Sequence, residues 1–246
     1  MMGEVTSDNV ARYQQPRCSL FRGERQLVDN LLRPGMRVLD LGCGSGRVSK
    51  YLLHRSARVL GCDLSRAALR ELQANLSLRR GLGISQGDAR QLPFKDCSFD
   101  AVIFAFAGID YIHPEAGRIT ALREVERVLV PEGYFILSSH NPLGTLLSPR
   151  GFRSWRGWRW RGQYLLSGAW GKAYFRDYGG LLLYQALPRK VIEQVTMQTR
   201  MQFCFALSRS GGMRSLPILS MLSAGPYYVF VRSGPYAGGK GSLPPV

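Results

Sequence analysis

Short apolar runs and segments of helical spacing alternate along the first half of this chain. Apolar positions within residues 22–32 recur at helical spacing, which predicts a short amphipathic helix that Pro34 and Gly35 end. Residues 36–41 form a short apolar run that leads into glycines, and residues 47–54 return to helical spacing. The pattern therefore predicts a helix, a strand, a tight turn and a second helix, in this order.

The same alternation continues to residue 139 and resumes after residue 181. Strands that alternate with helices are typical of a parallel, doubly wound sheet covered on both faces. Such sheets bind ligands at the carboxyl ends of their strands. Further strands are expected at residues 57–62, 83–86, 99–106, 134–139, 181–187, 201–207 and 227–231, and further helices at 65–80, 118–129 and 189–199.

The length and composition suit one large domain. With 246 residues, 45% of them hydrophobic, the chain is long enough for one α/β core and short for two. We expect this domain to span residues 1–233, with an irregular insertion at 142–180 and a flexible tail at 234–246. No stretch has the apolar length of a membrane helix and the first residues lack a signal-peptide core, so a cytoplasmic protein is expected.

The charge balance is strongly positive, at +16. Taken alone, this charge favours nucleic acid, an anionic membrane surface or an acidic ligand as the partner. Most of the basic residues are arginine, however, and genome composition also produces this bias. The five cysteines are odd in number and lack the paired C-x-x-C spacing of a metal or redox site, so we expect free thiols and no bound metal.

A glycine-rich turn follows the first predicted strand. Gly42, Gly44 and Gly46 have the spacing G-x-G-x-G, whereas a dinucleotide fingerprint has G-x-G-x-x-G with a pyrophosphate at the helix N-terminus. The carboxylate of Asp40 would repel a pyrophosphate but can orient the ammonium group of an amino acid. Glycines also let a ligand approach the backbone, whose N–H groups we expect to be free. The turn thus favours S-adenosylmethionine (SAM) over NAD.

Two further carboxylates follow the next two predicted strands. Asp63 ends a strand about 20 residues beyond the turn, where a ribose would present its hydroxyl groups. Asp88 and Ala89 come just after the following strand, where a carboxylate and a backbone N–H can bind the amine and a ring nitrogen of adenine. Leu64 is expected to pack on the adenine face.

These segments together resemble the class I SAM-dependent methyltransferases, in their small-molecule branch of type 11. The stretches that carry the resemblance are residues 38–46, 60–64, 87–94, 98–100 and 124–139, within an expected cofactor-binding core at 33–141. The resemblance implies a Rossmann-like α/β fold with a doubly wound, mostly parallel sheet of seven strands, helices on both faces and a lid inserted after the fifth strand. It implies SAM as the cofactor, and a pocket formed by Tyr13, Asp40, Gly42, Cys43, Gly44, Asp63, Leu64, Asp88, Ala89, Phe104, Ala105 and Phe106.

The residues after the fourth and fifth main-sheet strands are the candidates for the methyl-acceptor side. Methyl transfer from a sulfonium is an in-line displacement on an activated donor, so alignment and exclusion of water can suffice. A hydroxyl acceptor benefits from a general base, for which His140 is the first candidate and His113 the second. Each can equally be a loop residue held by hydrogen bonds. Asp110 either orients an amine acceptor or caps the following segment.

Residues 150–161 interleave arginine with tryptophan, which is typical of surfaces that bind single-stranded nucleic acid or membranes. An insertion after the fifth strand is also where a lid over a small acceptor would lie, and we favour this interpretation. The leading hypothesis is methyl transfer to an oxygen or nitrogen of a small molecule such as a sugar, quinone, lipid or secondary metabolite. An RNA or ribosome methyltransferase and a catalytically silent SAM-binding module are the alternatives. The glycine spacing disfavours an NAD-dependent oxidoreductase.

Overall fold

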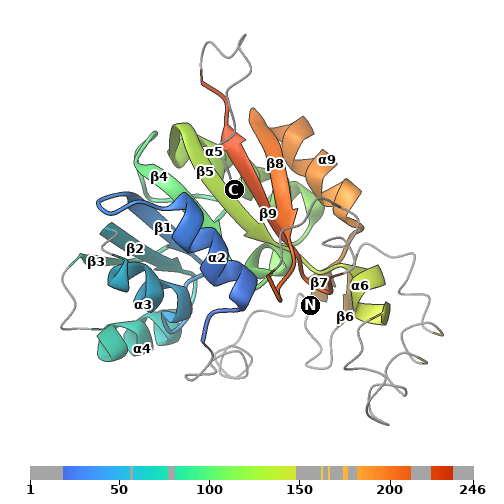
Figure 1. Ribbon diagram of the computed structural model, residues 1–246, viewed down its shortest axis with the longest axis horizontal. Coiled ribbons are helices and arrows are strands. Elements are labelled where there is room, and N and C mark those ends of the chain that lie inside the picture. Colours follow the sequence, from blue (N-terminus) through green and yellow to red (C-terminus); the bar gives the residue numbers. More distant parts are fainter. Residues whose placement is uncertain are drawn as a thin grey trace.

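The computed structural model has a central sheet between two layers of helices (Figure 1). It describes residues 19–55, 58–76, 81–147, 162, 166, 174–176, 182–211 and 223–234. Tyr13, residues 150–161, most of the predicted insertion and the tail beyond residue 234 therefore lie outside the described residues. None of the helices within the described ranges is long and apolar enough to cross a membrane.

The central sheet has seven strands in the spatial order β3-β2-β1-β4-β5-β9-β8. Neighbouring strands are parallel except at β9, which runs antiparallel to both β5 and β8. The order reverses between β1 and β4, and such sheets bind ligands at the carboxyl ends of the strands beside this point. The predicted doubly wound, mostly parallel sheet of seven strands is confirmed. The strands are β1 (Arg37–Leu41), β2 (Arg58–Asp63), β3 (Leu82–Gln86), β4 (Phe99–Phe104), β5 (Leu129–Ser138), β8 (Met201–Leu207) and β9 (Tyr227–Arg232).

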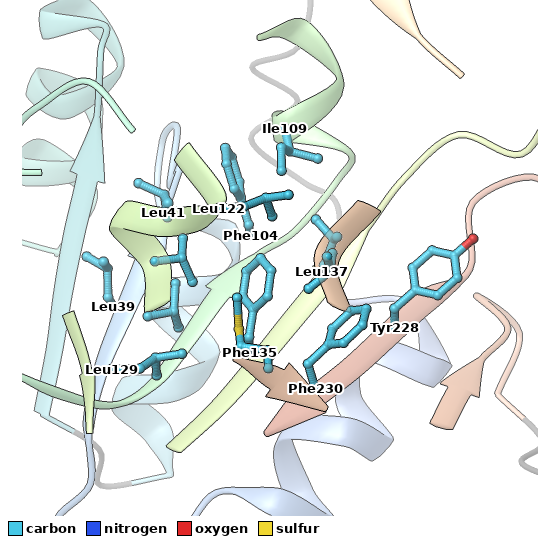
Figure 2. Close-up of a cluster of buried hydrophobic side chains, with 14 of the residues drawn as sticks. Leu39, Leu41, Phe104, Ile109, Leu122, Leu129, Phe135, Leu137, Tyr228 and Phe230 are labelled. Atoms are coloured by element: carbon cyan, nitrogen blue, oxygen red, sulfur yellow. The ribbon is translucent and has the colours of Figure 1, made fainter. Parts of the chain in front are cut away.

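Helices cover both faces of the sheet because successive strand residues point to opposite faces and both sets are apolar. One face packs on α2, α3 and α4, and the other on α5 and α9 (Figure 1). Figure 2 shows the core on the second face, where one cluster contains Leu39 of β1, Phe104 of β4, Phe135 of β5 and Leu122 of α5. The helices are α2 (Arg22–Leu31), α3 (Arg47–His54), α4 (Arg66–Leu76), α5 (Glu115–Val128) and α9 (Pro188–Gln198).

Two strands of the central sheet have a boundary that differs from the sequence prediction by two residues or more. The strand expected at 99–106 ends at Phe104, because Phe106 and Ala107 adopt left-handed backbone angles with φ of 53° and 58°. The strand expected at 134–139 begins at Leu129 and continues through the Pro-Glu-Gly segment that resembles a turn. Glu132 has a φ of 62° there, and the pairing with β4 shifts register at this point.

The segment predicted as a strand at 181–187 does not join the central sheet. Its strand, β7 (Leu182–Tyr184), pairs antiparallel with β6 (Tyr174–Arg176) in a separate two-stranded sheet. The edge of β5 is already occupied by β9, and β7 packs instead on the 3-10 turn η1 (Gly108–Tyr111) that follows β4. The short helix α6 (Pro142–Leu147) follows β5. The chain after β5 therefore returns to the carboxyl end of β4.

Candidate active site

The turn after β1 depends on two glycines with different tasks. Gly44 and Gly46 have φ angles of 53° and 91°, which side chains disfavour. A Cβ atom on Gly46 would lie 2.2 Å from a Cδ atom of Leu72, so this glycine lets the turn pack closely on α4. Among the described residues, none has an atom within 4 Å of a Cβ atom placed on Gly44. The space beside Gly44 is thus open, and a ligand can approach the backbone there.

Several backbone N–H groups of the turn are used within the protein. Gly42 and Cys43 donate to the carbonyl oxygen of Cys62 at 2.8 and 3.2 Å, and Gly44 donates to the Asp63 carboxylate at 2.9 Å. The expectation that the turn offers free N–H groups is wrong for these three residues. The bonds tie together the ends of the parallel neighbours β1 and β2. The Cys43 side chain is buried, so only its backbone can face a ligand.

The carboxylate of Asp63 joins the glycine turn to the start of α4. Its two oxygens accept the N–H groups of Gly44 and Ser65, at 2.9 and 2.8 Å. A carboxylate has about four acceptor positions, so two remain for further donors such as ribose hydroxyls. Leu64, the next residue, is 56% exposed. A charged acceptor and an exposed apolar side chain therefore lie side by side at the carboxyl end of β2.

Asp88 has a close partner that its position in the sequence does not reveal. The Arg90 guanidinium binds both carboxylate oxygens, with its Nη2 at 2.6 Å from Oδ2, and the Arg90 N–H donates to Oδ1 at 2.9 Å. This pairing holds the pKa of the Asp88 carboxyl below its usual value. Ala89 is half-buried and packs against the core. The contact of Asp88 with adenine remains a prediction, and an adenine amine would share the carboxylate with Arg90.

The segment that leaves β4 turns one aromatic ring outward. Phe104 and Ala105 are buried, whereas Phe106 is 42% exposed. The Phe106 ring stacks on Phe21, which precedes α2, with centroids 6.1 Å apart and planes 7° apart. Of the three residues predicted to line the cofactor pocket here, Phe106 is therefore the one whose side chain a ligand can reach.

Two arginines flank this aromatic pair. The guanidinium carbons of Arg47 and Arg209 lie between 5.1 and 5.7 Å from the centroids of both rings. Arg47 is also paired with the Glu24 carboxylate, at 2.8 Å between Nη2 and Oε1. Within the described part of the chain, no carboxylate lies within ion-pair distance of Arg209. The rim of the site beside Phe106 thus carries a positive charge.

On the opposite face of the sheet, a buried carboxylate holds a histidine. Asp110 lies in η1 after β4, and His140 follows β5. Oδ2 of Asp110 accepts the His140 backbone N–H at 2.6 Å and lies 2.8 Å from the ring nitrogen Nδ1. Oδ1 accepts the Ser139 hydroxyl at 2.8 Å. With Nδ1 donating to the carboxylate, Nε2 of the partly exposed ring remains available as a base.

This geometry revises two expectations for the acceptor side. Asp110 is fully buried and its oxygens are occupied by protein donors, so it cannot orient an amine acceptor directly. His113 lies 3.1 Å, through Nδ1, from the carbonyl oxygen of Tyr111 in its own loop, as expected of a loop residue held by hydrogen bonding. The structure therefore brings together Asp110 and His140 and gives His113 a separate, local partner.

Comparison with known proteins agrees with the strand order and the glycine turn. Residues 38–133 match the family described as "Methyltransferase domain". Residues 38–133 form a class I SAM-dependent methyltransferase domain. The identification that the sequence motifs suggested is confirmed.

Curated relatives share this methyltransferase domain. Phthiotriol/phenolphthiotriol dimycocerosates methyltransferase 1 of Mycobacterium ulcerans is 40% identical over 111 residues, or 44% of this chain and 39% of that protein. Probable tRNA methyltransferase 9B of Bos taurus is 35% identical over 105 residues, or 43% of this chain and 21% of that protein. The chain therefore matches less than half the length of these relatives.

Solved methyltransferase structures share the fold over most of the chain. One is the 1,6-didemethyltoxoflavin-N1-methyltransferase of Burkholderia thailandensis, solved with 1,6-didemethyltoxoflavin and S-adenosylhomocysteine bound. Its TM-score is 0.60 at 16% identity, and the match covers 85% of this chain and 76% of that chain. At this identity the likeness concerns the fold alone.

Asp40 lies beneath the glycine turn of the methyltransferase domain. Its side chain is fully buried and accepts the Ser49 hydroxyl of α3 at 2.5 Å. Burial raises the pKa of the Asp40 carboxyl to about 7, and the Ser49 bond and nearby Arg47 oppose this shift. The direct contact with a ligand ammonium group that the sequence suggested would require a reachable oxygen, and this geometry does not provide one. Asp40 instead anchors α3 to β1.

We expect the stability of the wild-type protein to depend on Asp40 protonation near neutral pH. The folded-state pKa of about 7 lies above the unfolded value, so the stabilisation is present at low pH and is lost as pH rises through 7. Between about pH 5 and 8, wild type should lose on the order of 2 kcal/mol of unfolding free energy relative to Asp40→Asn. Urea titrations of both proteins measure this difference, and parallel curves would contradict the assignment.

Several site residues give no recognisable signal in the sequence. Arg90 and Ser139 are adjacent to residues that the motifs identified, but nothing in their spacing assigns them a role. Phe21 and Arg209 are separated by most of the chain and meet at the rim only in the folded protein. Arg118 shares the helical spacing of the buried residues Ala121, Leu122 and Val125, and it is buried as well. Only the tertiary structure shows which partners its charge has there.

Proposed function

We propose that this protein transfers the methyl group of SAM to an oxygen or nitrogen of a small-molecule acceptor. The observation that carries the proposal is the Asp110–His140 pair, which lies at the carboxyl end of β5 in a methyltransferase domain whose glycine turn is open at Gly44. Cofactor residues and a base thus occur at the same edge of one sheet. Phe106, which follows β4, is exposed and offers an apolar surface for an acceptor ring.

The residues at this edge fit SAM. Asp63 has acceptor positions left for ribose hydroxyls, Leu64 presents an apolar face for adenine, and Gly44 leaves room beside the backbone. The positive charge of Arg209 suits a carboxylate group at the rim. When bound, SAM supplies a methyl group already activated on a sulfonium.

The chain's own residues then provide alignment and a proton acceptor. A hydroxyl acceptor that takes up this methyl group would pass its proton to Nε2 of His140. The Asp110 carboxylate holds Nδ1 and compensates the positive charge that develops on the ring. An amine acceptor that enters as the neutral base attacks without prior proton removal, and the same base accepts the proton that the product releases.

RNA is the second acceptor class that an observation favours. The net charge of +16 suits a polyanion, and one relative is named as a tRNA methyltransferase. We favour a small molecule because the His140 ring of the Asp110–His140 pair is partly buried. Residues 150–161, the predicted lid over a small acceptor, lie outside the described part of the chain. Incubation with methyl-labelled SAM and either a metabolite extract or total RNA separates the two classes. Label in the RNA fraction alone would overturn the small-molecule proposal.

We expect Asp63→Ala to weaken SAM binding by about 1 to 3 kcal/mol, because ribose hydroxyls lose a charged acceptor. Calorimetry on the wild type and the variant measures this difference. Asp100→Ala is a matched control, since Asp100 pairs with Arg37 at the opposite end of β1. NAD should bind neither protein.

Three results would contradict the cofactor assignment: tight NAD binding without a response to SAM, unchanged SAM affinity in Asp63→Ala, or an equal loss in the Asp100→Ala control. SAM binding with no labelled product in either fraction would instead favour the catalytically silent module.

A further inference from the structure

A buried arginine lies behind the Asp110–His140 pair. Arg118, on α5, is 1% exposed and Asp110 is 0% exposed. Its Nη1 donates to the carbonyl oxygen of Ile109 at 2.7 Å and to Oδ1 of Asp110 at 3.2 Å. A buried charge is costly unless it is paired and hydrogen-bonded, so the two side chains depend on each other for their burial.

Arg118 is held from two other elements as well. Its Nη2 donates to the Gln194 side chain of α9 at 3.2 Å, and its guanidinium lies 3.7 Å from the ring centroid of Tyr184 on β7. A planar guanidinium can stack on a ring with its face while its N–H groups donate hydrogen bonds in its plane. An ammonium group cannot do both. Helices α5 and α9 and strand β7 thus determine where the guanidinium lies. The guanidinium in turn donates hydrogen bonds to Ile109 and Asp110 of η1.

The two oxygens of Asp110 have separate partners. Oδ1 accepts from Arg118 and from the Ser139 hydroxyl, while Oδ2 accepts from the backbone and the ring of His140. Donors on Oδ1 fix the plane of the carboxylate, and this plane determines the direction in which Oδ2 meets Nδ1. The His140 side chain is 29% exposed. Without the bond to Asp110, its imidazole ring would be free to rotate.

We propose that Arg118 is a positioning residue that orients Asp110 and thereby holds His140 in the tautomer with the proton on Nδ1. In this tautomer Nε2 carries the lone pair and can take a proton from an acceptor. The role of Nε2 rests on the proposed function, whereas the effect of Arg118 on the ring does not. Nothing in the methyltransferase domain match assigns a role to this arginine, which acts from the far side of the carboxylate.

Nitrogen NMR of the histidine rings tests this proposal without knowledge of the acceptor. The chain has three histidines, so the His140 ring signals can be assigned by their loss in His140→Gln. Wild type should show His140 with a protonated Nδ1 whose hydrogen exchanges slowly with water. Arg118→Met should lose the slowly exchanging hydrogen and shift the ring toward a mixture of tautomers.

Arg118→Lys is the second variant, for the case that Arg118→Met does not fold. It keeps the positive charge but cannot stack on Tyr184 and bind two acceptors in one plane, so it should show the same change to a smaller extent. Arg123→Gln is the matched control, because Arg123 lies on the same helix, is exposed and bonds to Gln198 instead. Circular dichroism monitors folding of each protein.

An unchanged His140 tautomer and exchange rate in folded Arg118→Met would overturn the proposal, because a merely structural arginine would change stability and leave the ring as it is. Where Arg118→Met does not fold, the same result in folded Arg118→Lys would overturn it. The same changes in Arg123→Gln would also overturn it, since they would reflect a general loosening. Absence of methyl transfer by the wild type would refute the proposed function and leave the ring measurement intact. The two proposals therefore fail separately.

Discussion

Replacing His140 with alanine is expected to lower turnover of a hydroxyl acceptor by roughly 10²-fold or more, while SAM affinity stays within about twofold. The reason is that removal of the acceptor proton contributes to the transition state and not to cofactor binding. The His140 ring is held by Asp110, on the face of the sheet that α5 covers. In the described part of the chain, it makes no bond to the glycine turn or to Asp63, which bond to each other. Initial rates with labelled SAM and the acceptor found by extract methylation measure the first quantity, and calorimetry the second.

The three histidines provide their own comparison. His54 ends α3 and is exposed, so His54→Ala should keep wild-type turnover. His113→Ala should also stay close to wild type, since its ring bonds within its own loop. A large loss in His113→Ala with normal turnover in His140→Ala would exchange the two assignments. Normal turnover in both would leave catalysis by alignment alone.

Alanine at Gly44 and at Gly46 is expected to separate cofactor binding from folding. Gly46→Ala should cost about 2 to 3 kcal/mol of stability, because its Cβ would collide with Leu72 at a position that also has a positive φ. Gly44→Ala meets open space and should cost about 1 kcal/mol through its backbone angle alone. Its methyl group would occupy the space left for SAM, so affinity should fall about tenfold or more.

Urea unfolding and calorimetry on the two variants measure both effects. The two variants are expected to show opposite effects. Gly46→Ala should lose stability and, where folded, bind SAM with an affinity closer to that of wild type. Gly44→Ala should remain stable and bind SAM weakly. Equal SAM affinity in Gly44→Ala and wild type would mean that the open space beside Gly44 does not receive the cofactor.

Arginine bonding explains part of the basic composition without a nucleic acid. Arg127 illustrates this use, because it binds the carboxylates of Glu124 and Asp96 and two backbone carbonyls, which joins α5 to the loop before β4. Arg37 likewise fastens β1 to β4 through Asp100. Each forms several bonds in one plane, which lysine cannot reproduce. The number of arginines alone is therefore weak support for RNA binding. The excess of basic residues over carboxylates is the stronger argument for an RNA acceptor.

The alternation of apolar runs and helical spacing was sufficient to predict the class of the fold. It was sufficient because side-chain periodicity is a local property, and an alternating order of strands and helices permits few sheet topologies. The glycine turn and Asp63 were predictable for a related reason, since each lies within a few residues of a strand end. Their internal hydrogen bonds were not, because Gly44 reaches Asp63 across two strands that only the folded sheet brings together.

The sequence by itself determined the methyltransferase core and the candidates His140 and Asp110, each at the end of a strand. Only the tertiary structure decided that these two form one pair, that His113 stands apart, and that Asp40 lies beneath the turn rather than beside a ligand. It also decided the partners of Arg118, whose charge is buried on the apolar face of α5. The physical reason is that burial and pairing depend on which distant elements meet. Local patterns specify which faces are apolar, but the sheet order and the packing of α5, α9 and β7 determine which charges must be buried together.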